Sequence, residues 1–277
     1  MSSTPHYSTP EEMNEAIRKY WEQEDTVSII DKNLHRIEMD TVLGHLLPGD
    51  TVADVGCGEG AATAEYGRKV KRVQAFERSD TLRAKAARRF ADLGLKNVTV
   101  EPGDVLTLSG HDGAGHDGAF DAIVSQRMLI NLPDWETQQK GILNLHRMLK
   151  PGGRLIMVEN TDDAFAAMNA MRAEMDVPPV PQHWHNIFFD YDKLKPFMER
   201  RFETVKEYDF ALYYFLTRVY VPMFASFTGF GLNAKKDPIF DLSDAAARRA
   251  FEAFGDKVKF DVGRALGPIQ CFVYRKK

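Results

Sequence analysis

The sequence predicts an α/β protein whose core is a seven-stranded, mostly parallel sheet. Two observations support this prediction. The apolar run Thr51–Val55 is bounded by turn residues, as is typical of a buried parallel strand, and it leads through a glycine-rich turn into a helix that begins at Ala61. Further apolar runs then alternate with helical patterns along the chain, beginning with residues 73–76, and this alternation is typical of repeated strand–helix units.

The composition is that of a globular protein, with 44% hydrophobic and 27% charged residues in a chain of 277. A net charge of −4 provides no general attraction to nucleic acid. Two cysteines, Cys57 and Cys271, and the lack of a signal peptide or membrane-spanning run predict a cytoplasmic protein without stable membrane insertion. We expect an N-terminal helical cap over residues 1–48, a core over 49–160 and insertions over 161–277.

The glycine turn after the first strand predicts a nucleotide site. Gly56, Gly58 and Gly60 allow a ligand to approach the backbone closely, and the N–H groups of the turn and of the helix start face that ligand. The spacing G-x-G-x-G differs from the dinucleotide pattern G-x-G-x-x-G. The second strand ends on Glu77, where an acidic side chain commonly holds ribose hydroxyls.

Residues 52–60 resemble the first motif of the class I S-adenosylmethionine-dependent methyltransferases, and the resemblance extends over residues 35–160. It implies a Rossmann-like fold with an antiparallel last strand, S-adenosylmethionine as cofactor and S-adenosylhomocysteine as product. It also implies that the glycines hold the methionine moiety, Glu77 the ribose, and Asp104 with Val105 the adenine. The other expected cofactor residues are Asp54, Arg78 and Gln126. Leu149–Gly153 carries the family's Leu-Lys-Pro-Gly-Gly connector.

The first expected helix begins at a capping box, Thr9–Glu12. Apolar residues follow at helical spacing as Met13, Ile17, Tyr20 and Trp21. This helix either packs on the core or, as in related small-molecule methyltransferases, covers the pocket as a lid with Tyr20 and Trp21 in its wall.

The remaining elements are expected to continue the alternation. We expect helices over about 33–47, 80–93, 135–149 and 192–202, and strands over 98–100, 120–125, 154–159, 205–210 and 269–274. Residues 160–181 and the intervals around the sixth strand are expected to be insertions that form a lid. The repeated Gly-His-Asp-Gly tract offers possible metal ligands, but its glycines favour a mobile loop, and we predict no metal site. The residues concerned are His111, Asp112, His116 and Asp117.

Acceptor contacts are expected where the fourth strand ends, because ligands of open parallel sheets lie at the carboxyl ends of the strands. Arg127 and Asn131 are the polar groups placed there, although Asn131 equally fits as a cap of the next turn. Methyltransferases that act on nucleic-acid bases carry an Asn/Asp-Pro-Pro-aromatic segment at this point, whereas this chain has Ser-Gln-Arg-Met. A base is therefore not the expected acceptor.

His183 and His185 are the candidate general bases, because histidine exchanges protons near neutral pH. We expect them to point to opposite sides of an extended segment, so that one faces the methyl group. The alternative is that both only hydrogen-bond the backbone. Further acceptor contacts are expected from Trp184, Tyr213, Tyr214 and Arg218, the last through its fork of donors. Residues 212–227 alternatively form core or an interfacial surface.

These features predict in-line methyl transfer from S-adenosylmethionine to an oxygen or nitrogen of a small polar metabolite. The C-terminal Trp-His-Asn and Tyr-Tyr-Phe-Leu-Thr-Arg segments are also similar to uncharacterised bacterial methyltransferases of polysaccharide or natural-product assembly. This similarity favours a sugar derivative or natural-product intermediate. The alternatives are methylation of a lipid-linked saccharide or protein at a membrane surface, and a regulatory protein that binds the cofactor without catalysis.

Overall fold

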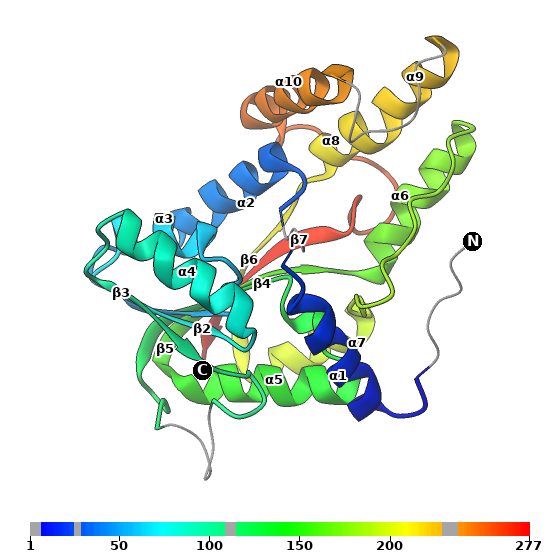
Figure 1. Cartoon of the computed structure of the whole chain (residues 1–277). Coiled ribbons are helices and arrows are strands. Elements are labelled where there is room, and N and C mark those ends of the chain that lie inside the picture. The colour runs from blue at the N-terminus through cyan, green and yellow to red at the C-terminus, as the bar shows by residue number, and fades with distance from the viewer. Residues whose placement is uncertain (1–6, 25–28, 109–114, 229–237) are drawn as a thin grey trace.

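The computed structural model describes residues 7–24, 29–108, 115–228 and 238–277. Its centre is a seven-stranded sheet in the order β3-β2-β1-β4-β5-β7-β6 (Figure 1). The strands are β1 (Thr51–Val55), β2 (Arg72–Glu77), β3 (Val98–Pro102), β4 (Phe120–Gln126), β5 (Leu149–Asn160), β6 (Phe202–Asp209) and β7 (Ile269–Lys276).

The pairing confirms the predicted sheet. β1 is parallel to β2 and β4, and β5 continues the parallel order beside β4. β7 lies between β5 and β6 and is antiparallel to both. β6 begins at Phe202 rather than at the predicted Val205, and Phe202 is buried in the core.

The helices cover both faces of this sheet. They are α1 (Pro10–Trp21), α2 (Lys32–Gly44), α3 (Ala61–Lys69), α4 (Asp80–Asp92), α5 (Trp135–Met148), α6 (Asp162–Glu174), α7 (Tyr191–Glu199), α8 (Ala211–Tyr214), α9 (Val221–Thr228) and α10 (Pro238–Phe254), with a 3-10 turn η1 (Leu129–Asn131) and a π-helical segment η2 (Phe215–Tyr220). Half of the predicted capping box is present, since the Thr9 side chain accepts from Glu12 N and proline follows at the first helical position, whereas the Glu12 carboxylate accepts from Ser8 N and not from Thr9 N. Among the described residues, no helix is both long and apolar enough to cross a membrane.

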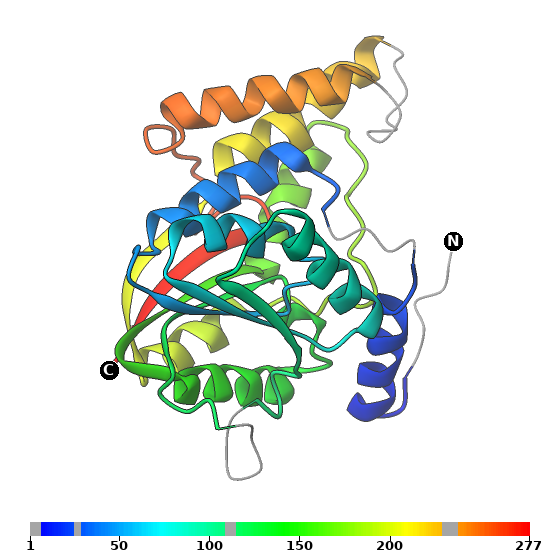
Figure 2. The ribbon, with the colours of Figure 1, turned by 60° about the vertical axis from the view of Figure 1, so that its left-hand side comes forward.

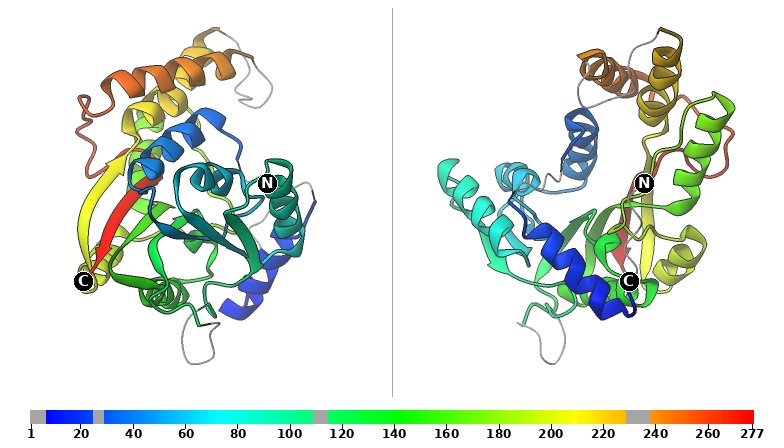
Figure 3. Two further views of the ribbon diagram at one scale, coloured as in Figure 1. Left: turned by 90° about the vertical axis from the view of Figure 1, so that its left-hand side faces the viewer. Right: turned by 45° about the vertical axis from the view of Figure 1, so that its right-hand side comes forward.

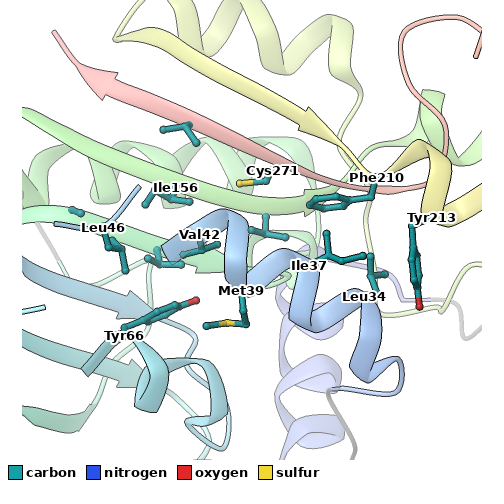
Figure 4. Close-up of a cluster of buried hydrophobic side chains, with 14 of the residues drawn as sticks. Leu34, Ile37, Met39, Val42, Leu46, Tyr66, Ile156, Phe210, Tyr213 and Cys271 are labelled. Carbon is teal, nitrogen blue, oxygen red and sulfur yellow. The ribbon is translucent and has the colours of Figure 1, made fainter. Parts of the chain in front are cut away.

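Two apolar cores lie on opposite faces of the sheet, because successive side chains of a strand point to opposite sides. In β5, Ile156 and Val158 join the core beneath α2, α3 and α4, while Leu155 and Met157 join the core beneath α5 and α7. Figure 4 shows how α2 packs on the first core through Leu34, Ile37 and Val42. α2 is thereby fixed across the sheet.

The C-terminal insertions form a second layer above α2. α8, η2 and α10 pack on one another, α10 packs on α2, and η2 packs on α6. Figures 1 and 2 show α9 and α10 at the top of the molecule and α5 at the bottom, and Figure 3 shows α6 on the same side as α9. Residues 160–181, expected as an insertion, contain α6. The apolar stretch 212–227 is helical throughout.

Candidate cofactor and acceptor site

A cavity of about 900 Å³ opens at the carboxyl ends of β1, β2, β4 and β5, the edge at which open parallel sheets bind ligands. Sixteen of the residues predicted from the sequence line it: Tyr20, Trp21, Asp54, Gly56, Gly58, Glu77, Arg78, Asp104, Val105, Gln126, Arg127, Asn131, His183, His185, Tyr214 and Arg218. Gly60, Trp184 and Tyr213 do not line it.

The glycine turn is anchored on β2, because the N–H groups of Gly56 and Cys57 both donate to the Phe76 carbonyl, at 2.8 and 3.2 Å. Gly58 has a φ of +56°, and a Cβ built there would meet no atom within 4 Å. The turn therefore leaves open space beside Gly58, where a ligand can approach the backbone.

Gly60 has a different role from the one predicted. It is the N-cap of α3 with a φ of +75°, and a Cβ there would lie 2.6 Å from the Phe90 ring. Gly60 therefore faces the packing between α3 and α4 and not the cavity. The structure therefore gives Gly60 a role in helix packing, in place of the predicted contact with the cofactor.

Glu77 joins the turn to the cavity. One carboxylate oxygen accepts from Gly58 N at 2.8 Å and the other from Ser79 N at 2.9 Å. The side chain is buried, and burial raises its pKa above the ordinary value. The carboxylate thus fixes the glycine turn and faces the position expected for a ribose.

The neighbouring acidic residues are also held in place. Thr63 Oγ1 donates to Asp54 Oδ2 at 2.6 Å, and burial raises the pKa of Asp54 to about 7. Asp104 Oδ1 accepts from Leu106 N at 2.9 Å. Arg78 lies 3.8 Å from the other Asp104 oxygen and donates to a side chain of α1. Asp54, Arg78 and Asp104 thus line the cavity at the carboxyl ends of β1, β2 and β3.

Six buried side-chain polar atoms in the described part of the chain have no hydrogen-bond partner, and five of them belong to residues that line the cavity. They are His35 Nδ1, Glu38 Oε1, Gln126 Nε2, Asn160 Oδ1 and His185 Nδ1. Buried polar groups are normally paired, so this concentration marks the wall where a ligand supplies the missing partners.

Helix α1 covers the cavity and is tied to its rim, which favours the lid over simple packing on the core. Trp21 Nε1 donates to Asn131 Oδ1 at 3.0 Å, and Asn131 Nδ2 donates to the Arg127 carbonyl at 2.6 Å. Ser79 Oγ also donates to the Trp21 carbonyl. The Asn131 amide is therefore engaged within the protein and holds the lid.

The two predicted bases do not point to opposite sides. Their rings stack with centroids 5.6 Å apart, and both residues line the cavity. The expectation was wrong because residues two apart share one face of an extended chain, and this segment also turns, since Asn186 N donates to the His183 carbonyl. Burial, and then the nearby His183, lowers the pKa of His185 to about 4. His185 is thus neutral at pH 7 and a weak proton acceptor.

Two arginines line the cavity, and each is already paired with a carboxylate. Arg127 NH1 lies 2.6 Å from Glu38 Oε2, and Arg218 pairs with Asp31. Tyr213 is fully buried and donates to Asp31 at 2.8 Å. The prediction that Tyr213 contacts the acceptor is therefore not supported, because its hydroxyl is used to hold the start of α2. Trp184 packs instead against Tyr7 and Tyr20 of the lid segment.

Sequence reasoning missed several polar groups of the site. His35 and Glu38 lie three residues apart on α2 and both line the cavity, and Asn160 lines it at the end of β5. The available signal in the sequence was the presence of two polar residues, His35 and Glu38, within the apolar face of the predicted helix 33–47.

Glu159 is a buried acid next to the site, at the end of β5. Burial raises its pKa to about 7, although it accepts from Ser125 Oγ and from the N–H groups of the β4–η1 loop.

Within the described ranges, no three potential metal ligands cluster together. His111 and Asp112 of the predicted loop lie outside the described residues. His116 packs against the rings of Phe76 and Phe120, with centroids 5.0 and 6.0 Å away.

Comparison with known proteins agrees with this geometry. Residues 52–153 match the family model described as a methyltransferase domain. The protein-L-isoaspartate O-methyltransferase of Brucella anthropi is 34% identical over 113 residues, which cover 41% of this chain and 46% of that protein. An S-adenosyl-L-methionine-dependent Diels-Alderase of Talaromyces variabilis is 31% identical over 135 residues, which cover 47% of this chain and 43% of that protein. The matches thus span slightly less than half the length of these curated relatives.

Among solved structures, the N-methyltransferase NodS of Bradyrhizobium japonicum, in complex with S-adenosyl-L-homocysteine, shares the fold with a TM-score of 0.54. It is 13% identical, and the alignment covers 95% of this chain and 98% of that one. Residues 52–153 therefore carry a methyltransferase domain, and the glycine turn and the sheet order around it are those expected for the class I S-adenosylmethionine-dependent family.

Proposed function

We propose that the protein transfers the methyl group of S-adenosylmethionine to an oxygen or nitrogen of a small polar metabolite, such as a sugar derivative or natural-product intermediate. The observation that supports this most directly is the continuity of the cavity. It runs from Gly58 and Glu77 to the unpartnered polar atoms of α2, β4 and β5, beneath the lid. Its volume of about 900 Å³ is near the upper end of the range for ligand sites, about 300–1,000 Å³, which suits a cofactor and an acceptor together.

The residues present fit the cofactor. Gly58 leaves open space at the turn, Glu77 presents a carboxylate to ribose hydroxyls, and Asp104 with Val105 lies beside β3 for the adenine. The unpartnered Gln126 Nε2 offers a donor where β4 ends. S-adenosylmethionine supplies a methyl group on a positively charged sulfur, which is the group to be transferred.

The protein contributes alignment and exclusion of water. Holding two reactants in line removes up to about 7–11 kcal/mol of the barrier to reaction. α1 serves this purpose because the Trp21–Asn131 hydrogen bond closes the lid directly over the loop that follows β4. In the acceptor half Arg127 is paired with Glu38, and Arg218 with Asp31 and Asp244, so neither positive charge is left for a ligand, and we propose a neutral polar acceptor rather than a strongly anionic one.

Calorimetric titration tests the cofactor assignment. We expect micromolar binding of S-adenosylmethionine and S-adenosylhomocysteine and no binding of NAD, because the turn lacks the dinucleotide spacing. Incubation with methyl-labelled S-adenosylmethionine and a small-molecule extract of bacteria should then label an acceptor. Binding of NAD alone would refute the cofactor assignment. Cofactor binding without label transfer into any fraction would favour the regulatory alternative.

One observation favours a second candidate, a lipid-linked saccharide at a membrane surface. Phe227 on α9 is 81% exposed, and Tyr220 and Phe224 on the same helical run are about half exposed. Exposed aromatic side chains on a helix suit the interface of a bilayer. Co-sedimentation with phosphatidylglycerol vesicles, lost in a Phe227→Ser variant, would support this acceptor. No sedimentation of the wild type would exclude it.

A further inference from the structure

A histidine and a carboxylate on α2 form a polar cluster that the predicted function did not include. His35 and Glu38 are three residues apart, so they lie on the same face of the helix. His35 Nδ1 is 3.7 Å from Glu38 Oε2, and the same oxygen lies 2.6 Å from Arg127 NH1. All three residues line the cavity. The His35 ring, the Glu38 carboxylate and the Arg127 guanidinium thus lie next to one another, in that order, along one wall of the cavity.

The position of the cluster separates it from the expected cofactor residues. All of those residues except Gln126 lie at or just after the ends of β1, β2 and β3, on one half of the sheet. Arg127 follows β4, and α2 contacts β7, on the other half. Asn160 at the end of β5 and Tyr214 of α8 also line the cavity there. The cluster therefore faces the half of the cavity that remains for the acceptor, next to the β4 terminus where the reacting sulfur is expected.

The state of Glu38 is suited to holding a histidine. Burial alone would raise its pKa, but Arg127 and His35 outweigh burial and bring the pKa below the ordinary value. The carboxylate is thus ionised at neutral pH although the side chain is fully buried. Its Oε1 and the Nδ1 of His35 have no hydrogen-bond partner, and a small rotation of the ring would join Nδ1 to the carboxylate. This contact would leave the other ring nitrogen, Nε2, for a ligand.

His35 differs in this respect from the histidines predicted from the sequence. The His185 ring is stacked on Tyr20 with centroids 4.3 Å apart and has no ion-pair partner among the described side chains. A base gains from a carboxylate that orients its ring and stabilises the charge it acquires with the proton. Among the three histidines that line the cavity, only His35 has a carboxylate within 4.0 Å in the described structure.

We infer that His35 is the general base of the reaction and that Glu38, fixed by Arg127, is its positioning residue. The inference rests on the proposed methyl transfer and identifies the acceptor as a molecule that presents a hydroxyl or a neutral amine hydrogen. His35 Nε2 takes that proton while the oxygen or nitrogen bonds to the methyl carbon. The carbon–sulfur bond breaks with its electron pair staying on sulfur, so the products are the methylated acceptor, S-adenosylhomocysteine and a protonated His35.

The positioning by Glu38 has a test that needs no acceptor. Nitrogen-15 NMR of the protein bound to S-adenosylhomocysteine shows which ring nitrogen of each histidine carries the proton, and the His35→Gln spectrum assigns the signal. In the wild type we expect the His35 proton on Nδ1, facing the Glu38 carboxylate, and in Glu38→Gln a mixture of the two tautomers, since the charged acceptor is removed.

Asp40→Asn is the matched control, because Asp40 lies on the same helix but is exposed and paired with Arg36. It should leave the His35 tautomer unchanged. The same tautomer in wild type and Glu38→Gln would overturn the positioning role. If Glu38→Gln loses cooperative melting because Arg127 is left unpaired, Glu38→Asp replaces it. The shorter carboxylate should still give a measurable change in the tautomer ratio.

The catalytic role is tested with methyl-labelled S-adenosylmethionine and the bacterial small-molecule extract. His35→Gln should bind S-adenosylhomocysteine with an unchanged Kd and transfer label about a hundredfold more slowly at pH 7, the lower end of what a positioned base contributes. A rate within about threefold of wild type would overturn the assignment of His35. Wild-type protein that fails to bind S-adenosylmethionine would instead refute the proposed function, whatever the His35 tautomer shows.

Discussion

Replacing Glu77 by glutamine tests the ribose site and the glycine turn at once. Both carboxylate oxygens accept backbone hydrogen bonds, from Gly58 N at 2.8 Å and Ser79 N at 2.9 Å. A glutamine amide has one accepting oxygen, so one of the two N–H groups must then face an NH₂ group. The substitution is nearly isosteric, and its effect can therefore be attributed to charge and hydrogen bonding.

The expected loss of affinity follows from the bonds to the cofactor. Hydrogen bonds to a charged group contribute about 1.5–3 kcal/mol, so the Kd for S-adenosylhomocysteine should rise about 10- to 150-fold. The unpaired backbone N–H should lower the free energy of unfolding by about 1–3 kcal/mol. At about 2–4 °C per kcal/mol for a domain of this size, the Tm should fall by roughly 2–12 °C.

Calorimetry at 25 °C measures the Kd, and thermal melting confirms that the variant is folded. Glu101→Gln is a suitable control, because Glu101 on β3 accepts from Gln74 Nε2 through one oxygen, which glutamine can replace. We expect it to bind the cofactor as the wild type does. A folded Glu77→Gln protein with a Kd within twofold of wild type would refute the ribose assignment.

Three further substitutions test the lid, the glycine turn and the buried acid. Trp21→Phe removes the donor to Asn131, a hydrogen bond worth about 0.5–1.5 kcal/mol. Amide exchange across α1, measured by mass spectrometry, should therefore accelerate about two- to tenfold. Unchanged exchange would contradict the idea that this bond holds the lid. Gly60→Ala should lower the free energy of unfolding in urea by about 2 kcal/mol, because of the left-handed φ at Gly60 and its close approach to Phe90. The cofactor Kd should stay unchanged, and weaker binding would mean that Gly60 does belong to the cofactor site. Glu159 has a folded pKa of about 7, raised above its unfolded value, so its stabilising effect is complete below about pH 4 and is lost as the pH rises through 7. Between pH 4.5 and 8 the wild type should therefore lose about 3 kcal/mol relative to Glu159→Gln in urea unfolding, and parallel pH curves would contradict the assignment.

The sheet and the cofactor half of the site were predictable because their signals are local. Thr51–Val55 is a continuous apolar run beside a glycine turn, and Glu77 follows the next run directly. Each of these placements depends only on residues that are neighbours in the sequence and on the rule that parallel strands end at one edge. The position of these residues around one cavity follows from the topology alone.

The acceptor half was harder to predict because its contacts join distant parts of the chain. Glu38 and Arg127 are 89 positions apart, and Tyr213 bonds to Asp31 across 182 positions. Local patterns do not say which polar residues face inward, so they predict Tyr213 in the cavity and do not single out His35 on α2. The same limitation applies to Gly60, whose neighbour Phe90 lies on the following helix.

The position of β7 has a consequence for biosynthesis. β6 pairs only with β7 in the described structure, and β7 also covers the edge of β5. A ribosome must therefore make residues 210–268 before β6 obtains its partner and β5 obtains its second one. During that interval the nascent chain presents open strand edges, which invite pairing with other chains. A product that stops before Ile269 would keep them open permanently, so premature termination should yield aggregated protein rather than a shortened enzyme.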